Sequence, residues 1–324
     1  MATRSPLALE FSRKLDDNAP SEDEMKIKAF SKDAGYRWLL TMLVAIISIT
    51  GLSRMNFMLE MKTVQFGIQL SIVIYCTGLS LILIGHLRKS PAFFAASDFF
   101  CSVSQIWTFL VFAAGVQYIA AAHNLPLVDE FFLRADKALG FDWDAYNRWI
   151  ATSTHVNTLL IFGYNSFYIQ MFAIGLIHSA RQKSDGNAEF AWCYMTMLLL
   201  VIAISAIAPA MGRPGMLGNH HIEVFLAARK GMVSDIAGII SFPSFHAAMG
   251  TLFIYSVRTI RPLLAIFLPL NVLLILATPP CGGHYLVDTL AGIAVAFLAI
   301  SLVRQFQMRQ ASAAEYYLYH TDTA

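Results

Sequence analysis

The sequence is poor in charged residues, and this shortage limits what the protein can be. Asp, Glu, Lys and Arg make up only 14% of its 324 residues, whereas 57% are hydrophobic. A water-soluble domain of ordinary composition carries more charge than this. The net charge is only +2, which indicates no nucleic-acid-binding surface, so nucleic acid is not an expected partner.

Cysteine is scarce as well, and the spacing of the four that are present matches neither a zinc knuckle nor a disulfide framework. Three of the four fall inside apolar runs, where we expect them to pack as small core residues. The chain also lacks an internal repeat, which argues against a transporter built from duplicated halves. The cysteines are Cys76, Cys101, Cys193 and Cys281.

Long apolar runs dominate the rest of the chain. A transmembrane helix needs roughly 17 to 25 apolar residues, and eight windows of about this length can be read in the sequence. We therefore predict an all-α, polytopic transmembrane helix bundle with about eight spans. The windows are 36–53, 65–87, 98–121, 156–179, 189–210, 243–258, 262–280 and 285–304.

The windows and the charges between them predict the organisation of the chain. Residues 1–35 lack the apolar core of a signal peptide and are expected to form a polar cytoplasmic tail. Two additional spans occupy 36–97, a six-span catalytic core occupies 98–305, and a second cytoplasmic tail occupies 306–324. With both termini inside, 15 of the 23 Lys and Arg residues lie on the cytoplasmic side, as the positive-inside rule requires. We expect an integral protein of a bacterial inner membrane whose active site lies on the outer face.

Residues 124–150 separate the third and fourth predicted spans. Apolar side chains recur there at helical spacing, with charged residues between them, which predicts an amphipathic helix in the membrane interface. Trp143, Tyr146 and Trp149 would lie at the depth of the lipid headgroups. The alternative is a simple surface loop.

Two histidine motifs stand where apolar runs begin, and they are the candidate catalytic residues. His284 and Asp288 are four positions apart (i and i+4), so they share one helix face and the carboxylate can accept a hydrogen bond from the imidazole. The second ring nitrogen is then free to act as a nucleophile. His246 ends the other motif, Phe242-Pro243-Ser244-Phe245-His246, and as a membrane-embedded ionisable residue it is also a candidate for function.

Three further residues favour a phosphate ligand. Ser244 adds a hydroxyl at a helix start, where free backbone amides attract anions. Gly283 lets a ligand approach the backbone closely, and Arg213 can offer a bidentate guanidinium to a phosphoryl group.

A metal site remains an alternative use of the histidines, with Asp288 better placed to orient an imidazole than to bind a metal. A serine acyl-transfer triad finds no nucleophile elbow around Ser244.

The order of Arg213-Pro214, Pro243-Ser244-Phe245-His246 and His284-x-x-x-Asp288 resembles the three signature motifs of the type 2 phosphatidic acid phosphatase superfamily. The resemblance implies a phosphohistidine formed on His284, which Asp288 orients. It also implies that His246 protonates the leaving oxygen and later activates the acceptor. Arg213 and the amides near Ser244 and Gly283 would hold the phosphoryl oxygens, with no metal and no cofactor.

Three positions depart from that pattern, because the lysine, arginine and glycine it usually contains are here Ala206, Thr278 and Phe245. The form His284-Tyr285-Leu286-Val287-Asp288 is similar instead to the inositolphosphotransferase-like branch, which includes the sphingomyelin and inositol phosphorylceramide synthases. We expect a phosphotransferase acting on a membrane lipid. A lipid phosphatase and a non-enzymatic lipid-binding protein of the same fold are the alternatives, and the oligomeric state is unknown.

Overall fold

The computed structural model describes residues 22–59, 61–181, 184–233 and 238–321, and almost all of them are helical. The one exception with regular structure is a short parallel pairing of β1 (Met58–Leu59) with β2 (Met232–Val233). Most of the predicted tail at 1–35 lies outside the described residues. The helices are α2 (Glu22–Arg54), α3 (Met61–Arg88), α4 (Pro91–Ala122), α5 (Asp129–Ala138), α6 (Trp143–Ala151), α7 (Thr154–Ala180), α8 (Ser184–Ile207), α9 (His220–Arg229), α10 (Phe245–Val257), α11 (Arg261–Gly282) and α12 (Leu286–Thr321).

The predicted fold class, a polytopic helical bundle, is confirmed. Seven helices of the described chain are long and apolar enough to cross a membrane, which fits an integral membrane protein. They correspond to seven of the eight predicted windows. The remaining window, 243–258, forms α10, a helix of only 13 residues, so the count of eight full-length spans is corrected to seven and one short helix.

The short helix α10 runs from the level of Tyr164 in α7 to the level of Glu189 in α8. It begins beside Tyr164 of α7, whose ring stacks on His246 at 4.4 Å between centroids. At its other end Arg258 forms an ion pair of 3.4 Å with Glu189, which lies in the second turn of α8. At 1.5 Å per residue, α10 rises about 20 Å.

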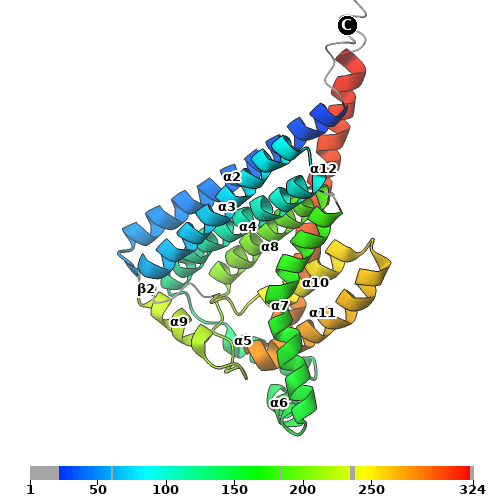
Figure 1. Cartoon of the computed structure of the whole chain (residues 1–324). Coiled ribbons are helices and arrows are strands. Elements are labelled where there is room, and N and C mark those ends of the chain that lie inside the picture. Colours follow the sequence, from blue (N-terminus) through cyan, green and yellow to red (C-terminus); the bar gives the residue numbers. More distant parts are fainter. Residues whose placement is uncertain (1–21, 60, 182–183, 234–237, 322–324) are drawn as a thin grey trace, which may run out of the picture.

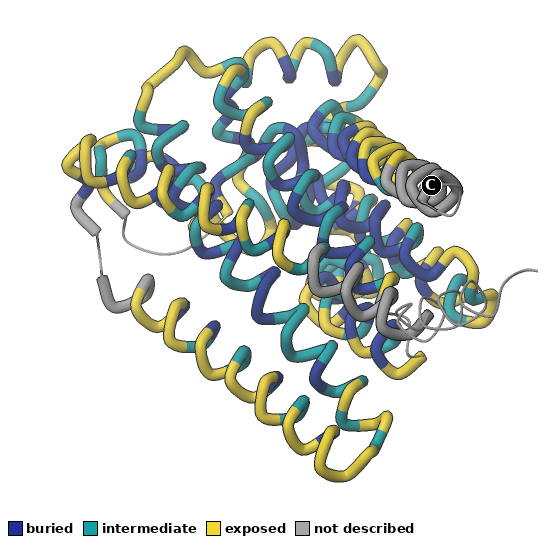
Figure 2. The backbone as a smooth tube through the Cα atoms, turned by 90° about the horizontal axis from the view of Figure 1, so that it is seen from above, coloured by how far each residue is buried: buried dark blue, intermediate teal, exposed yellow. Residues whose placement is uncertain are grey.

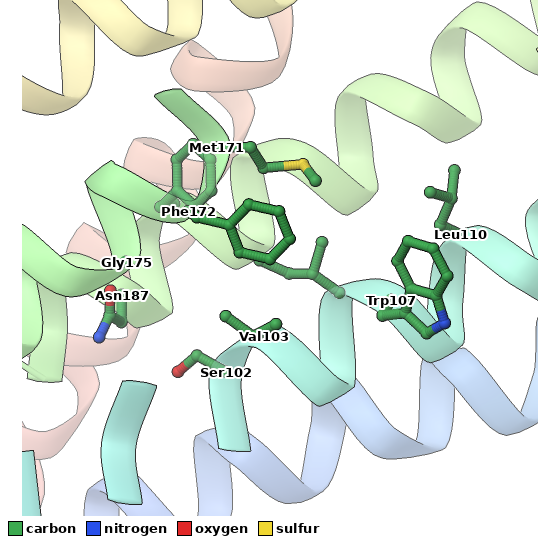
Figure 3. Close-up of a pocket in the computed structure, with 10 residues that line it drawn as sticks. Ser102, Val103, Trp107, Leu110, Met171, Phe172, Gly175 and Asn187 are labelled. Carbon is green, nitrogen blue, oxygen red and sulfur yellow. The ribbon is translucent and has the colours of Figure 1, made fainter. Parts of the chain in front are cut away.

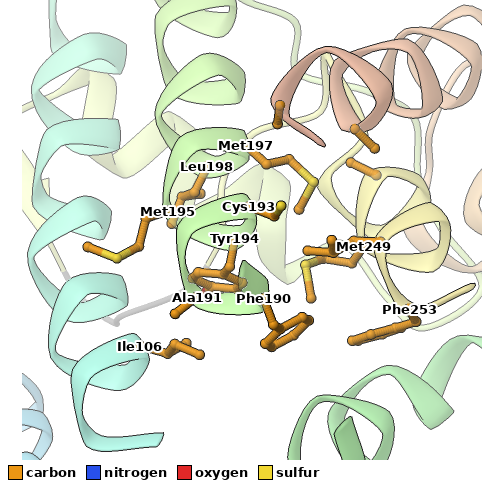
Figure 4. Close-up of a cluster of buried hydrophobic side chains, with 14 of the residues drawn as sticks. Ile106, Phe190, Ala191, Cys193, Tyr194, Met195, Met197, Leu198, Met249 and Phe253 are labelled. Carbon is orange, nitrogen blue, oxygen red and sulfur yellow. The ribbon is translucent and has the colours of Figure 1, made fainter. Parts of the chain in front are cut away.

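Helix α8 lies at the centre of the fold (Figure 1). Its apolar side chains pack between α4 and α10, where Ile106, Cys193, Met249 and Phe253 belong to one buried cluster (Figure 4). Helices α2 and α3 pack mainly on α4. The outer helices expose one face and bury the other, as helices surrounded by lipid do (Figure 2).

The predicted amphipathic segment 124–150 forms two short helices rather than one. Gly140 lies between α5 and α6 and has a φ of +77°, which is not a helical conformation, so it separates the two helices. Glycine adopts this conformation readily because it lacks a Cβ atom. Helices α5, α6 and α9 gather at the end of the molecule opposite the C-terminus (Figure 1). The simple-loop alternative is therefore excluded, and this end of the bundle is covered by helices.

Candidate active site

A cavity of about 200 Å³ is bordered by residues of α4, α8 and α9, and both candidate catalytic histidines line it. Its wall combines polar residues from several elements with apolar residues from α4, α8 and α10. None of the described residues that line it is Lys or Arg. The lining residues are Leu110, Gln117, Tyr164, Leu198, Val201, Leu217, Gly218, His220, His221, Gly238, Ile240, Ser241, Phe245, His246, Cys281, Gly282 and His284.

The imidazole of His284 is fixed by a backbone carbonyl. Its Nδ1 lies 2.9 Å from the carbonyl oxygen of Ser241 and 3.5 Å from Oδ2 of Asp288. A carbonyl can only accept a hydrogen bond, so Nδ1 carries the proton. The neutral ring therefore has its lone pair on Nε2, which is the form that a nucleophile needs.

Asp288 supports this arrangement mainly through Ser241 rather than through a short hydrogen bond to His284. Its carboxylate is fully buried, and Oδ2 accepts hydrogen bonds from the Ser241 hydroxyl at 2.8 Å and the Tyr285 amide at 2.9 Å. Its backbone carbonyl accepts from the amide of Ser244. Asp288 thus ties the segment before α10 to the start of α12, and Ser241 joins it to His284.

His246 lies across the cavity from His284, with 6.4 Å between the two ring centroids. Its ring stacks on that of Tyr164 with an interplanar angle of 19°, and its Nδ1 lies 3.4 Å from the Tyr164 hydroxyl. The ring also packs against Phe167. The structure therefore brings the two predicted catalytic histidines together at one cavity and holds their rings at an angle of 58° to one another.

Ser244 and Gly283 lie beside the two histidines but are engaged in packing. The Ser244 hydroxyl accepts a hydrogen bond from the amide of Ala247, so it caps α10, and its side chain is fully buried. Gly283 ends α11 with φ of +68°, and a Cβ atom there would lie 1.8 Å from the carbonyl oxygen of Arg213. The absence of a side chain at Gly283 therefore lets the Arg213 backbone approach closely, and the approach of a ligand there stays a prediction.

The Arg213 side chain is held by α6. Its guanidinium forms an ion pair of 2.9 Å with Asp144 and lies 4.2 Å above the ring of Trp143. Its backbone amide donates to the carbonyl of Gly283 at 2.7 Å. Arg213 is therefore anchored next to His284 through its backbone, while its side chain is absent from the residues that line the cavity.

Two carboxylates of α5 hold the backbone around the site. Asp136 is buried and accepts hydrogen bonds from the amides of Leu286 and Val287, at the start of α12. Asp129 accepts from the amides of Met211 and Gly212. Burial raises the pKa of Asp136, and its two backbone hydrogen bonds oppose this shift.

Tyr164 was not predicted to be part of the site, Ser241 was considered only as a possible N-cap of the helix near His246, and His220 and His221 only as residues that could complete a metal site; the N-cap of α10 is Ser244. His221 lies in the first turn of α9, lines the cavity and has an Nε2 without a hydrogen-bond partner among the described residues. Burial, together with the neighbouring histidines, lowers the pKa of His221 to about 4. The adjacent pair His220-His221 was a visible signal in the sequence, but only the fold shows that both line the same cavity as His246 and His284.

The described residues contain no group of three or more His, Cys, Asp or Glu side chains that could hold a metal ion. Thr278 stands where the resembled motif pattern usually has an arginine. Its side chain is buried, and its hydroxyl lies 2.8 Å from that of Thr289.

A second, smaller cavity of about 20 Å³ lies between α4 and α7 (Figure 3). Trp107 and Leu110 of α4 face Met171 and Phe172 of α7 across it. Leu110 also lines the cavity of the histidines. The Leu110 side chain therefore borders both cavities.

Comparison with known proteins gives one match. Residues 130–302 match the family model described as the PAP2 superfamily. The matched region contains both histidines, Asp288 and Arg213. No curated protein matches the chain, and no solved structure matches it.

Proposed function

Because the chain belongs to the PAP2 superfamily, we propose that it transfers a phosphoryl group of a membrane lipid through a covalent intermediate on His284. Members of this superfamily are phosphatases or related phosphoesterases, so an enzyme acting on phosphoesters is the general function. The orientation of His284 carries the specific proposal. Its Nδ1 is held by the Ser241 carbonyl, which leaves Nε2 available for attack on phosphorus.

The two histidines divide the chemistry between them. In the first half-reaction Nε2 of His284 bonds to phosphorus, the bond from phosphorus to the leaving oxygen breaks, and protonated His246 gives that oxygen a proton. In the second, an acceptor hydroxyl gives its proton to His246, its oxygen bonds to phosphorus, and the bond to His284 breaks. The distance of 6.4 Å between the two rings supports this division, because the acid must lie across phosphorus from the nucleophile.

The charge of the cavity supports a phosphodiester over a phosphomonoester as the substrate. A phosphodiester carries one negative charge, whereas a phosphomonoester carries nearly two at neutral pH. The described lining residues include neither Lys nor Arg, and an uncompensated dianion in a buried site is more costly than a monoanion. We therefore favour a phosphotransferase of the inositolphosphotransferase-like type. Hydrolysis shares the first half-reaction, so a lipid phosphatase is the second candidate.

The test uses purified full-length protein in vesicles with a panel of phospholipids and polyprenyl phosphates labelled in the phosphate. We expect turnover by the wild type, and label on His284 after rapid denaturation. The variant His284→Ala should lose roughly a thousandfold or more, and His246→Ala roughly a hundredfold or more. A new labelled lipid identifies a transferase, and released water-soluble phosphate identifies a phosphatase.

The matched control is His155→Ala, because His155 is exposed in the first turn of α7 and does not line the cavity. It should retain wild-type turnover. Turnover by His284→Ala at the wild-type rate would rule out the nucleophile. No turnover by the wild type with any member of the panel would favour a non-enzymatic lipid-binding protein.

A further inference from the structure

Two further histidines of α9, His220 and His221, also line the cavity, and the proposed reaction uses neither; in the described part of the chain, His221 has the unpartnered ring nitrogen. It comes from α9, whereas His246 belongs to α10 and His284 precedes α12. A positive charge on His284 disfavours a positive charge on His221, so the two rings are close enough to interact electrostatically. The cavity is therefore lined from three separate elements by imidazoles.

The hydrogen bonding of His221 defines what it can bind. The His221 ring forms a hydrogen bond with the backbone of Arg213, and this bond raises the pKa of His221. A ring N–H that donates to a carbonyl has this effect, because the bond favours the protonated ring. Nε2 is buried and has no partner among the described residues. With the other nitrogen donating, the neutral ring carries a lone pair on Nε2. This nitrogen lacks a donor, and an anionic oxygen cannot supply one.

The walls around His221 indicate the chemistry of that donor. Gln117 adds a polar group, and its Oε1 accepts from the amide of Ile239, so its NH₂ group remains able to donate. Leu198 and Val201 of α8 provide apolar surface in the same cavity. A hydroxyl group on an apolar molecule matches both features, because the hydroxyl donates to nitrogen and the chain fills the apolar part.

We propose that His221 binds the hydroxyl group of the acceptor, and that this acceptor is an alcohol with an apolar chain, such as a lipid alcohol. The inference rests on the proposed function and assigns a site to its second substrate. Nε2 of His221 accepts a hydrogen bond from the hydroxyl as the acceptor enters. The proton passes to His246 only when the oxygen reaches phosphorus on His284.

The test measures binding of an alcohol and needs no donor lipid, so it is independent of turnover. Full-length protein in vesicles is photolabelled with an octanol that carries a diazirine, and the labelled residues are mapped by mass spectrometry. A diazirine-bearing alkane of the same length is the matched probe without a hydroxyl. We expect the alcohol to label the cavity wall around Leu198 and Val201, in competition with unlabelled 1-octanol.

The variants separate the hydroxyl contact from the packing of the helix. His221→Leu and His221→Ala should lower labelling by the alcohol at least fivefold without changing labelling by the alkane. His221→Gln should restore much of it, since the amide oxygen can accept, and His155→Ala should have no effect. Thermal unfolding of each purified variant identifies those that are folded, and the comparison uses these.

Two outcomes would overturn the proposal. One is labelling of the cavity by the alcohol in His221→Leu or His221→Ala at the wild-type level. The other is the absence of competable labelling in the wild type. The proposed function fails separately, through turnover by His284→Ala, whereas that variant should retain labelling by the alcohol.

Discussion

Helices α5 and α6 are neighbours in the chain, and both use carboxylates to hold the site, but they hold different things. Asp129 and Asp136 of α5 bind backbone amides of the segments that precede Arg213 and follow His284. Asp144 of α6 binds the Arg213 side chain and is itself 59% exposed. The first arrangement fixes where the chain runs, whereas the second holds a group that can exchange partners.

The same contrast is visible in two carboxylates that bind helix N-termini. Asp136 caps α12 from a buried position, and its pKa is raised because burial outweighs its hydrogen bonds. Asp142 caps α6 from an exposed position, and its pKa is lowered because its hydrogen bond with the Ala145 amide outweighs the small effect of burial. One kind of contact therefore has opposite electrostatic consequences, depending on access to water.

Removal of the buried carboxylate on α5 should have the largest effect. We expect Asp136→Ala to lower the free energy of unfolding by about 2 to 3 kcal/mol, because two amides at the start of α12 lose a charged acceptor. Turnover should fall as well, since His284 lies two residues before that helix. Thermal unfolding in detergent and the lipid assay measure the two effects. Melting at the wild-type temperature would show that Asp136 does not hold α12.

The half-buried carboxylate of α5 should matter less. Asp129→Asn keeps an acceptor oxygen for Met211 and Gly212 but removes the charge, and we expect a loss of about 1 kcal/mol. The Arg213 backbone should shift with it and raise KM. Thermal unfolding and KM are measured for both variants, and the smaller loss of stability together with the raised KM distinguishes Asp129→Asn from Asp136→Ala. If Asp129→Asn proved the more destabilising of the two, the ranking by burial would be wrong.

The exposed contact of α6 should contribute least to stability. We expect Asp144→Asn to change the free energy of unfolding by less than about 1 kcal/mol. The freed Arg213 guanidinium should bind an anionic lipid more tightly, so KM should fall by about twofold to fivefold. High salt should remove most of this difference. A large loss of stability would show that α6 holds the fold in the same way as α5.

The smallest expected effect is on the pH dependence of stability. It compares the two carboxylates that cap helices, Asp136 at α12 and Asp142 at α6. The pKa of Asp136 is raised on folding, so its contribution should be present at pH values below its ordinary range and be lost as pH rises through the raised value. The pKa of Asp142 is lowered, so its contribution should be present above its ordinary range and be lost as pH falls. Thermal unfolding of the wild type, Asp136→Asn and Asp142→Asn from pH 3 to 7 measures both. Parallel curves for the two variants would contradict the opposite shifts.

The sequence predicted the spans well because hydrophobic length is a local property. Seven of the eight windows became long helices, and the eighth became the short α10. The break at Gly140 was also visible as a glycine, but its effect depends on φ of +77°, which no apolar pattern records. The topology of the termini and the outward orientation of the site remain predictions.

The site was predictable in its residues and less so in their contacts. His246 and His284 meet at one cavity, as the motifs indicated. The partner nearest to Nδ1 of His284 is the carbonyl of Ser241 rather than Asp288, and a backbone oxygen leaves no signal in a sequence. The anchor of Arg213 on Asp144 joins residues 69 positions apart, so it depends on how α6 folds back over the site.

The contact of Gly283 with Arg213 has a mechanical consequence. Two backbone hydrogen bonds join the segment after α8 to the end of α11, from Arg213 to Gly283 and from Met216 to Pro280. Because Gly215 and Gly283 carry no side chain, the two backbone segments lie in direct contact there. Because His284 directly follows Gly283, its position is tied to that of the segment after α8 by the backbone and not by a side chain that a substitution could remove.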